Sequence, residues 1–167
     1  RDRLYITHRG DVHINGNVNM GANRLDLWTD AAGDTVDITG SLAGTGQLEI
    51  TTLSNIGTAA GGDTITDASL GNITDGWSTV VFDSIHSNYT VNTAHQFVDD
   101  TYFQANTGRT VTVNGTIATA AGTDGVLRFG HSSQSPTLDI NAAIDTSANG
   151  GVVHFRKAAT LDVSGNI

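Results

Sequence analysis

A short pattern of apolar and polar positions recurs along the whole chain. Its form is apolar, any, apolar, polar, small, any, apolar, and residues 12–18 (VHINGNV) are a clear copy. Side chains of a strand point alternately to opposite faces, so the spaced apolar residues of each copy share one face, which can be buried. The pattern therefore predicts a short strand in every copy. The copies begin at residues 12, 36, 65, 89, 111, 138 and 161.

Two of these copies are incomplete. The copy at residue 89 matches over Tyr89–Asn92 alone, and the copy at residue 65 reaches Leu70 with one residue lost. The copy at residue 65 is included because the letters GDT lead into it, as they lead into the copy at residue 36. The spacing before it is the longest, at 29 residues, so we expect residues 53–62 to bulge from the fold as a loop.

A second strand is expected after each first strand, because an apolar, any, apolar triplet follows most copies. The triplet Leu4–Ile6 precedes the first copy and has the same form. Four of the five phenylalanines fall in one column of these strands, as stacked side chains of a repeat protein would. These phenylalanines are Phe82, Phe103, Phe129 and Phe155.

The paired strands predict a solenoid. One coil cannot bury its inner face alone, whereas stacked coils share a continuous core and pair their backbones about 4.8 Å apart. We therefore predict an all-β fold, a single-stranded parallel β-helix (β-solenoid) of about seven coils with about 25 residues each, wound right-handed. Residues 1–167 form a single β-solenoid domain in this interpretation. Because both terminal coils would expose strand edges, we expect a segment of a longer rod or a filament subunit that stacks head to tail.

Composition and charge narrow the range of partners. The chain has 16 Asp and 1 Glu against 7 Arg and 1 Lys, and its formal net charge is −9. Phosphate binding needs clustered Lys and Arg, so we expect no nucleic-acid partner. No apolar run approaches 18 residues, so we expect no membrane insertion. The absence of cysteine excludes a disulfide scaffold and a thiolate metal site.

Stacked carboxylates are the candidate metal ligands. Coil stacking would place Asp139 beside Asp162, and Asp26 beside Glu49. Carboxylates that close repel each other unless a cation lies between them, and Ca²⁺ prefers oxygen ligands. These four residues are therefore candidates for Ca²⁺ binding, and a solvated acidic face is the alternative interpretation. The strict calcium-repeat motif GGxGxDxUx is absent, and we expect no other cofactor.

One group of basic residues is the candidate glycan-binding site. It comprises Arg128, His131, His154, Arg156 and Lys157, and the repeat places Arg128 and His154 in one column. Such a group can engage an acidic glycan. Stacked carboxylates also raise an enzymatic alternative, because glycosidases use pairs of carboxyl groups. The chain contains no specific catalytic motif, so we expect no catalytic residues.

The repeats resemble those of large bacterial secreted β-solenoids. VHINGNV, VDITGSL, VTVNGTI, LDINAAIDTSANGG and LDVSGNI are similar to repeats of filamentous haemagglutinin-type exoproteins and autotransporter passenger domains. The resemblance covers essentially the whole chain. It implies export, a rod shape, and structural or adhesive work at the cell surface, and it carries no catalytic residues over to this chain.

We therefore expect a non-enzymatic extracellular rod, either an adhesin stalk or a filament building block. Its expected partners are further copies of the chain, or surface glycans and matrix. A polysaccharide-cleaving or acidic-glycan-binding β-helix is the alternative function, and part of a phage tail-spike is a lesser alternative.

Overall fold

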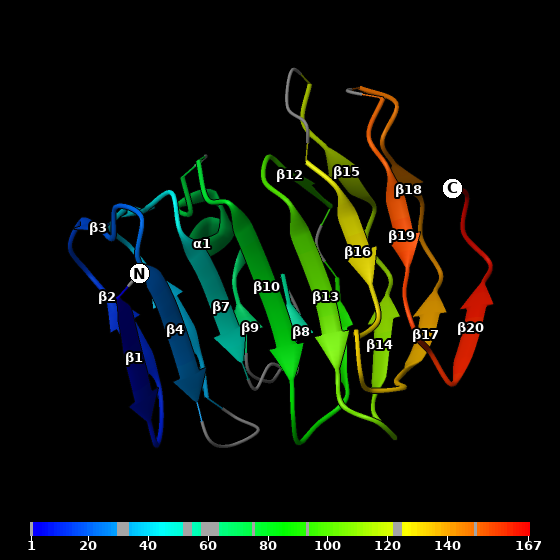
Figure 1. Cartoon of the computed structure of the whole chain (residues 1–167), viewed down its shortest axis with the longest axis horizontal. Coiled ribbons are helices and arrows are strands. Elements are labelled where there is room, and N and C mark those ends of the chain that lie inside the picture. Colours follow the sequence, from blue (N-terminus) through cyan, green and yellow to red (C-terminus); the bar gives the residue numbers. More distant parts are fainter. Residues whose placement is uncertain are drawn as a thin grey trace.

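Parallel strands stacked in successive coils form the framework of the described chain, as the sequence predicts (Figure 1). The computed structural model describes residues 2–29, 34–51, 55–57, 64–74, 76–92, 94–121, 125–148 and 150–167. All strand pairs among these residues are parallel. The winding is right-handed, because the front strands of Figure 1 run downward and those behind run upward as the chain advances to the right. The chain makes about six turns rather than seven, because the seven strands of the longest sheet enclose six turns.

Face A is the longest sheet, and it contains the predicted second strands. In order of pairing, it consists of β1 (Arg3–His8), β4 (Arg24–Thr29), β7 (Gln47–Thr51), β10 (Thr79–Ser84), β13 (Thr101–Ala105), β16 (Leu127–Phe129) and β19 (Val153–Phe155). Each strand pairs with the equivalent strand of the next coil. Leu25 lies opposite Leu48, and Phe82 lies opposite Phe103, so the predicted columns are confirmed.

Face B contains the predicted first strands, divided between two sheets. The smaller sheet pairs β2 (Val12–Ile14) with β5 (Val36–Ile38). The larger sheet has six strands and contains the other five predicted starts. In order of pairing, it consists of β20 (Thr160–Val163), β17 (Thr137–Ile140), β14 (Thr110–Val113), β11 (Tyr89–Val91), β8 (Asn55–Ile56) and β9 (Thr64–Ile65).

Face C is a third face of short strands that the sequence analysis did not assign. It consists of β3 (Val18–Asn19) paired with β6 (Leu42–Ala43), and of a sheet of β12 (His95–Phe97), β15 (Ile117–Thr119) and β18 (Ile144–Asp145). The final apolar position of the repeat supplies its inward residues. The pattern therefore identified the buried side chains of this face without identifying its strands.

Like side chains stack along the core. The rings of Phe82, Phe103, Phe129 and Phe155 stack in sequence, with centroids 5.6, 5.0 and 5.6 Å apart. Burial of one such side chain contributes about 1.5–3 kcal/mol to folding. This column confirms that the phenylalanines mark equivalent positions in successive coils.

A ladder of amides and hydroxyls runs along one corner of the rod. Asn141 Nδ2 donates to Asn114 Oδ1 at 3.2 Å, and the Ser164 hydroxyl donates to Asn141 Oδ1 at 3.0 Å. Asn92 Nδ2 donates in the same way to Asn55 Oδ1 at 3.3 Å. Each bond joins adjacent levels of the stack, so the ladder stabilises the corner as well as the turn within each coil.

The third turn departs from the repeat, and each of two predictions is wrong there over part of its residues. Residues 53–62 were expected to form a loop, but Asn55–Ile56 form β8, and Ile56 is buried in the core. Residues 53, 54 and 58–62 lie outside the described part of the chain. The copy predicted from Ile65 to Leu70 is wrong beyond Ile65, because the chain turns there into α1 (Asp67–Gly71).

Local sequence explains why α1 replaces a strand. The Thr66 side chain accepts a hydrogen bond from the Ser69 backbone N–H at 3.2 Å, which caps the helix, and Asp67 lies in its first turn. Both features favour a helix start. Ile73, after the helix, then takes the inward position of the repeat and bridges to Leu42.

Candidate functional site

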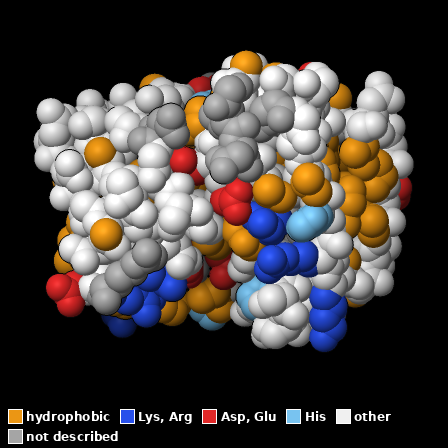
Figure 2. All heavy atoms as spheres, turned by 45° about the horizontal axis from the view of Figure 1, so that its top comes forward, with side chains coloured by type: hydrophobic (Ala, Val, Ile, Leu, Met, Phe, Trp, Pro, Cys, Tyr) orange, Lys and Arg blue, Asp and Glu red, His pale blue; other side chains and the backbone are white. Residues whose placement is uncertain are grey.

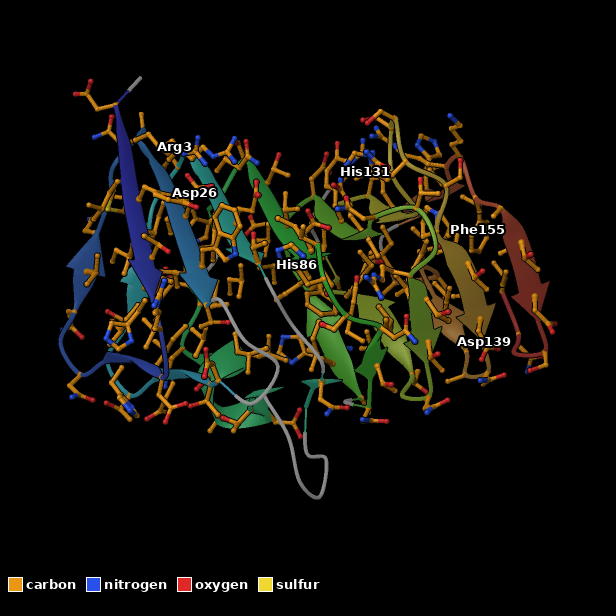
Figure 3. The ribbon with its side chains drawn as sticks, turned by 90° about the horizontal axis from the view of Figure 1, so that it is seen from below. Arg3, Asp26, His86, His131, Asp139 and Phe155 are labelled. Atoms are coloured by element: carbon orange, nitrogen blue, oxygen red, sulfur yellow. The ribbon has the colours of Figure 1, made fainter. Side chains whose placement is uncertain are left out.

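The outward positions of face A carry several long charged and aromatic side chains. Figure 3 shows Arg3, Asp26 and His131 along this side of the rod, while Asp139 projects from the opposite side. Strand alternation explains the arrangement, because each inward Leu or Phe of a face A strand is followed by an outward residue. Two clusters stand out on this face, one near each end of the rod.

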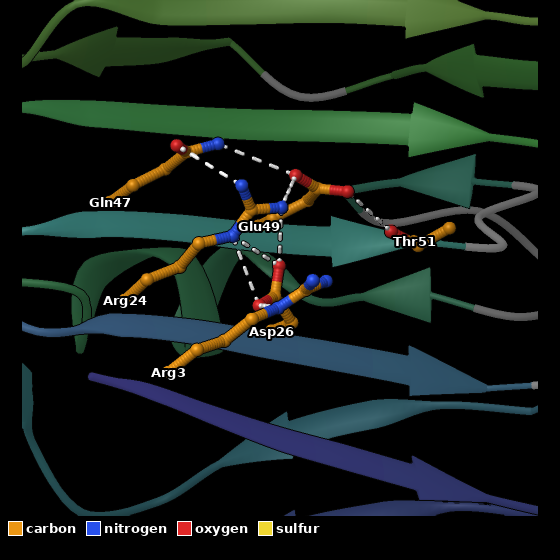
Figure 4. Close-up of polar contacts among 6 residues, drawn as sticks. All are labelled: Arg3, Arg24, Asp26, Gln47, Glu49 and Thr51. Atoms are coloured by element: carbon orange, nitrogen blue, oxygen red, sulfur yellow. Dashed lines mark hydrogen bonds and ion pairs between the residues drawn. The ribbon is translucent and has the colours of Figure 1, made fainter. Parts of the chain in front are cut away.

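The N-terminal cluster is a network of charges around Arg24 (Figure 4). The Arg24 guanidinium donates to Asp26, with Nη2 and Oδ1 2.7 Å apart, and also pairs with Glu49 of the next coil. Arg3 pairs with the same Asp26 carboxylate, which is 2% exposed. The buried carboxylate of Asp26 thus has two cationic partners, as burial of a charge requires.

The electrostatics of this cluster follow from burial and close charges. The hydrogen bond to Asp26 raises the pKa of Arg24, so this guanidinium stays charged. Burial raises the pKa of Glu49, and the nearby Asp26 and Asp83 carboxylates raise it further, while Arg24 opposes them. Burial likewise raises the pKa of Asp83, whose Oδ1 is buried without a partner among the described residues.

The predicted carboxylate stacks are present, with different surroundings. Asp26 lies opposite Glu49, and Asp139 lies opposite Asp162, as the repeat predicted. A cation between Asp26 and Glu49 would have to displace the Arg24 guanidinium, which already bridges them. Within the described residues, no group of three or more His, Asp or Glu side chains could hold a metal ion. Calcium binding at Asp139 and Asp162 stays a prediction.

The C-terminal cluster, which we call the basic cluster, consists of Tyr102, Arg128, His154 and Arg156. The guanidinium carbons of Arg128 and Arg156 lie over the Tyr102 ring, 4.7 and 4.9 Å from its centroid. Arg128 lies opposite Tyr102 in the coil before it and opposite His154 in the coil after it. Stacking on an aromatic ring holds a guanidinium in place while its N–H groups remain able to donate.

Arg128 is the more constrained of the two arginines. Its Nη1 donates to Asp100 Oδ2 at 2.6 Å, and its side chain is 15% exposed. Arg156 is half-buried and makes no ion pair with any described residue. The two guanidinium groups therefore differ in their contacts, because Arg128 is held by Asp100 whereas Arg156 has no described carboxylate partner.

The other two predicted members of the basic group lie at its border. His131 shapes the following bend, because its Nδ1 accepts the backbone N–H of Ser133 and of Gln134, each at 3.0 Å. Lys157 Nζ donates to the Ser133 carbonyl at 3.3 Å. Figure 2 shows Lys and Arg side chains in two groups, one right of the centre with His and acidic side chains beside it and one at the lower left.

Sequence reasoning missed Tyr102 and Asp100 as members of this site. Tyr102 immediately precedes Phe103 in β13. The phenylalanine column is the signal that could have identified Tyr102. Because Phe103 faces inward in that column, the adjacent Tyr102 must face outward. The ion pair of Asp100 with Arg128 spans 28 residues and has no signature in the sequence.

No protein-family model, curated protein or solved structure matches this chain. In the described part of the chain, no helix has the length and apolar character needed to cross a membrane. The functional conclusion therefore rests on the geometry of face A and its two clusters.

Proposed function

We propose that this chain is part of an extracellular, non-enzymatic rod that binds an acidic polysaccharide through the basic cluster. The observation that carries the proposal is the pair of guanidinium groups held over one tyrosine ring on an open sheet face. Arginine presents a rigid fork of donors that matches the two oxygens of a carboxylate or a sulfate ester. An acidic sugar residue would accept hydrogen bonds from the Arg156 guanidinium. His154, two residues earlier in the chain, would lie beside it.

Charge supports a specific rather than a diffuse interaction. The chain has a formal net charge of −9, so most of its surface repels a polyanion. The basic cluster is a local exception on that surface. A polyanionic chain would therefore be directed to this part of face A.

The rod itself supports a structural and adhesive role. Backbone pairing along face A links each of its strands to the next, and the phenylalanine column joins the last four of them. The resemblance of the repeats to secreted bacterial β-solenoids supports export and a cell-surface location. Self-association stays part of the proposal, because Leu161 and Val163 of the last coil are 46% and 37% exposed and could pack against a second copy.

On face B, the stacked carboxylates of the enzymatic alternative lack the burial that a general acid needs. Asp162 is exposed and Asp139 is half-buried on face B. Glu49 and Asp83, whose pKa values burial raises, lie on face A instead. Incubation with polygalacturonate, followed by an assay for new reducing ends and unsaturated products, tests this alternative; accumulation of product would replace the non-enzymatic proposal.

The direct test is binding to heparin and polygalacturonate, with neutral dextran as the comparison polymer. We expect Arg156→Gln to weaken binding of the acidic polymers about 10- to 150-fold, because one charge-assisted contact is worth about 1.5–3 kcal/mol. Arg128→Lys keeps the charge and should weaken binding by removing the planar fork.

Arg9→Gln is the matched control, because it removes the same charge from the corner between β1 and β2, at the other end of the rod. Calorimetry at two salt concentrations measures the affinities. Equal losses for Arg156→Gln and Arg9→Gln would show diffuse attraction and refute the proposed site. Equal affinity for dextran and heparin would refute the acidic class of ligand.

A further inference from the structure

The interruption of face C at the third turn leaves a cavity in the rod. Ile73 bridges to Leu42 on one side, and β12 pairs with β15 on the other, but no described pair joins Ile73 to β12. The helix α1 lies behind β7 and β10 at this level (Figure 1). The cavity has a volume of about 290 Å³. Its principal lining residues are Leu70, Ile73, Val80, Phe82, His95 and Phe97.

His95 is out of place in its column. The inward residues at the start of the face C strands are otherwise aliphatic, and His95 lies directly opposite Ile117. The remaining members of the column are Val18, Leu42, Ile73 and Ile144. A histidine thus replaces an aliphatic side chain on one of the two coils that border the gap, while Ile73 occupies the other. No ring nitrogen of His95 bonds to a described residue, so its imidazole faces the cavity as an open donor and acceptor.

The walls around His95 are aromatic. Its ring lies edge-to-face with Phe97, with centroids 4.7 Å apart, and Phe97 lies edge-to-face with Phe82 at 5.9 Å. Phe82 and Phe97 are 0% and 6% exposed. An aromatic guest would continue this edge-to-face packing, which is the preferred arrangement of aromatic rings.

The charges near the cavity are acidic. Asp99 lines it, and Asp67 of α1 lies close enough to His95 to oppose the effect of burial, which lowers the pKa of this histidine. His95 is therefore a neutral hydrogen-bonding group at neutral pH. Two nearby carboxylates disfavour an anionic guest.

We propose that this cavity binds a small neutral aromatic molecule with one hydroxyl group, its ring against Phe82 and Phe97 and its hydroxyl on the His95 imidazole. The volume is at the lower end of the range for ligand pockets, about 300–1,000 Å³, and suits a compact guest. Apolar cavities of roughly half this volume already accommodate benzene. The proposal concerns a second site and does not depend on glycan binding.

The test uses three probes of nearly equal shape: 4-ethylphenol, 4-ethyltoluene and 4-ethylbenzoate. Chemical-shift titration of the isotope-labelled full chain measures the affinity of each. We expect 4-ethylphenol to bind about 5- to 10-fold more tightly than 4-ethyltoluene, the effect of one hydrogen bond. The benzoate should not bind, and the shifted signals should include those of Leu70 and Phe97.

Two variants make the result specific. His95→Leu restores the residue type of the neighbouring coils, so the fold should persist, while the preference for the phenol over the toluene should disappear. Gly71→Leu places a large side chain on a residue that lines the cavity, and its Cβ meets no atom within 4 Å, so the fold should persist while both probes bind less tightly. A phenol preference that persists in folded His95→Leu, or the absence of any binding at millimolar probe, would overturn the proposal.

Discussion

Replacing Phe103 with alanine should be among the most destabilising single changes in this rod. Its side chain is 0% exposed. Its ring contacts three others, with centroids 5.6 Å away for Phe82, 5.0 Å for Phe129 and 5.4 Å for Phe97. Phe-to-Ala changes in a core cost about 3–5 kcal/mol through lost transfer energy and the cavity that remains. Three lost ring pairs place Phe103→Ala in the upper part of that range.

Phe155→Ala is the matched control, because the chemistry is the same at the end of the same column. Phe155 is half-buried and stacks on Phe129 alone among the described rings, at 5.6 Å. Its loss should cost about 1–2 kcal/mol, since less apolar area is removed from a packed environment. Urea unfolding followed by circular dichroism and by tryptophan fluorescence gives both values. Equal costs for the two variants would refute the stacked column as a source of stability.

Three further predictions address the backbone, the charges and the corner ladder. Gly40→Ala should lower the free energy of unfolding by about 1–3 kcal/mol, because the added Cβ would lie 2.2 Å from the Gly16 carbonyl oxygen. At Gly16 an added Cβ meets no atom within 4 Å, so Gly16→Ala should cost less in the same urea titration. Burial raises the pKa of Asp83, so the ionised carboxylate destabilises the folded state above that pKa. Asp83→Asn should therefore stabilise the protein at neutral pH, and this gain should vanish as the pH falls and the wild-type carboxyl protonates. Thermal melts across pH 4–8 would measure the change. Asn114→Ala removes two amide bonds of the ladder and should cost about 1–2 kcal/mol, and an unchanged melting temperature would contradict a stabilising ladder.

Sequence periodicity predicted most of the fold because inward residues repeat in every coil. The starts at Val12, Val36 and Leu138 are strands, and the phenylalanine column has the predicted register. The prediction failed where the repeat lost one residue. There the capping chemistry of Thr66 and a second strand at Asn55–Ile56 produced local structure that a fixed pattern does not describe.

The candidate sites were less predictable than the fold, because they depend on which outward side chains meet across coils. The column of Arg128 and His154 followed from register alone and is confirmed. The contact of Arg156 with Tyr102 spans two coils and depends on side-chain reach. The role of His95 required knowledge of the cavity, although its departure from an aliphatic column could have been noticed in the alignment of repeats.

Face A is the one face whose described strands pair without interruption from β1 to β19, whereas faces B and C change partners at the third turn. Face A therefore forms a continuous spine along one side of the rod. Faces B and C are interrupted at the third turn, and we call this interruption the joint. Bending about that spine would change the spacing of faces B and C while the pairing of face A stayed intact. A polymer bound along the spine would then keep its contacts, and a ligand bound in the joint would oppose the bending.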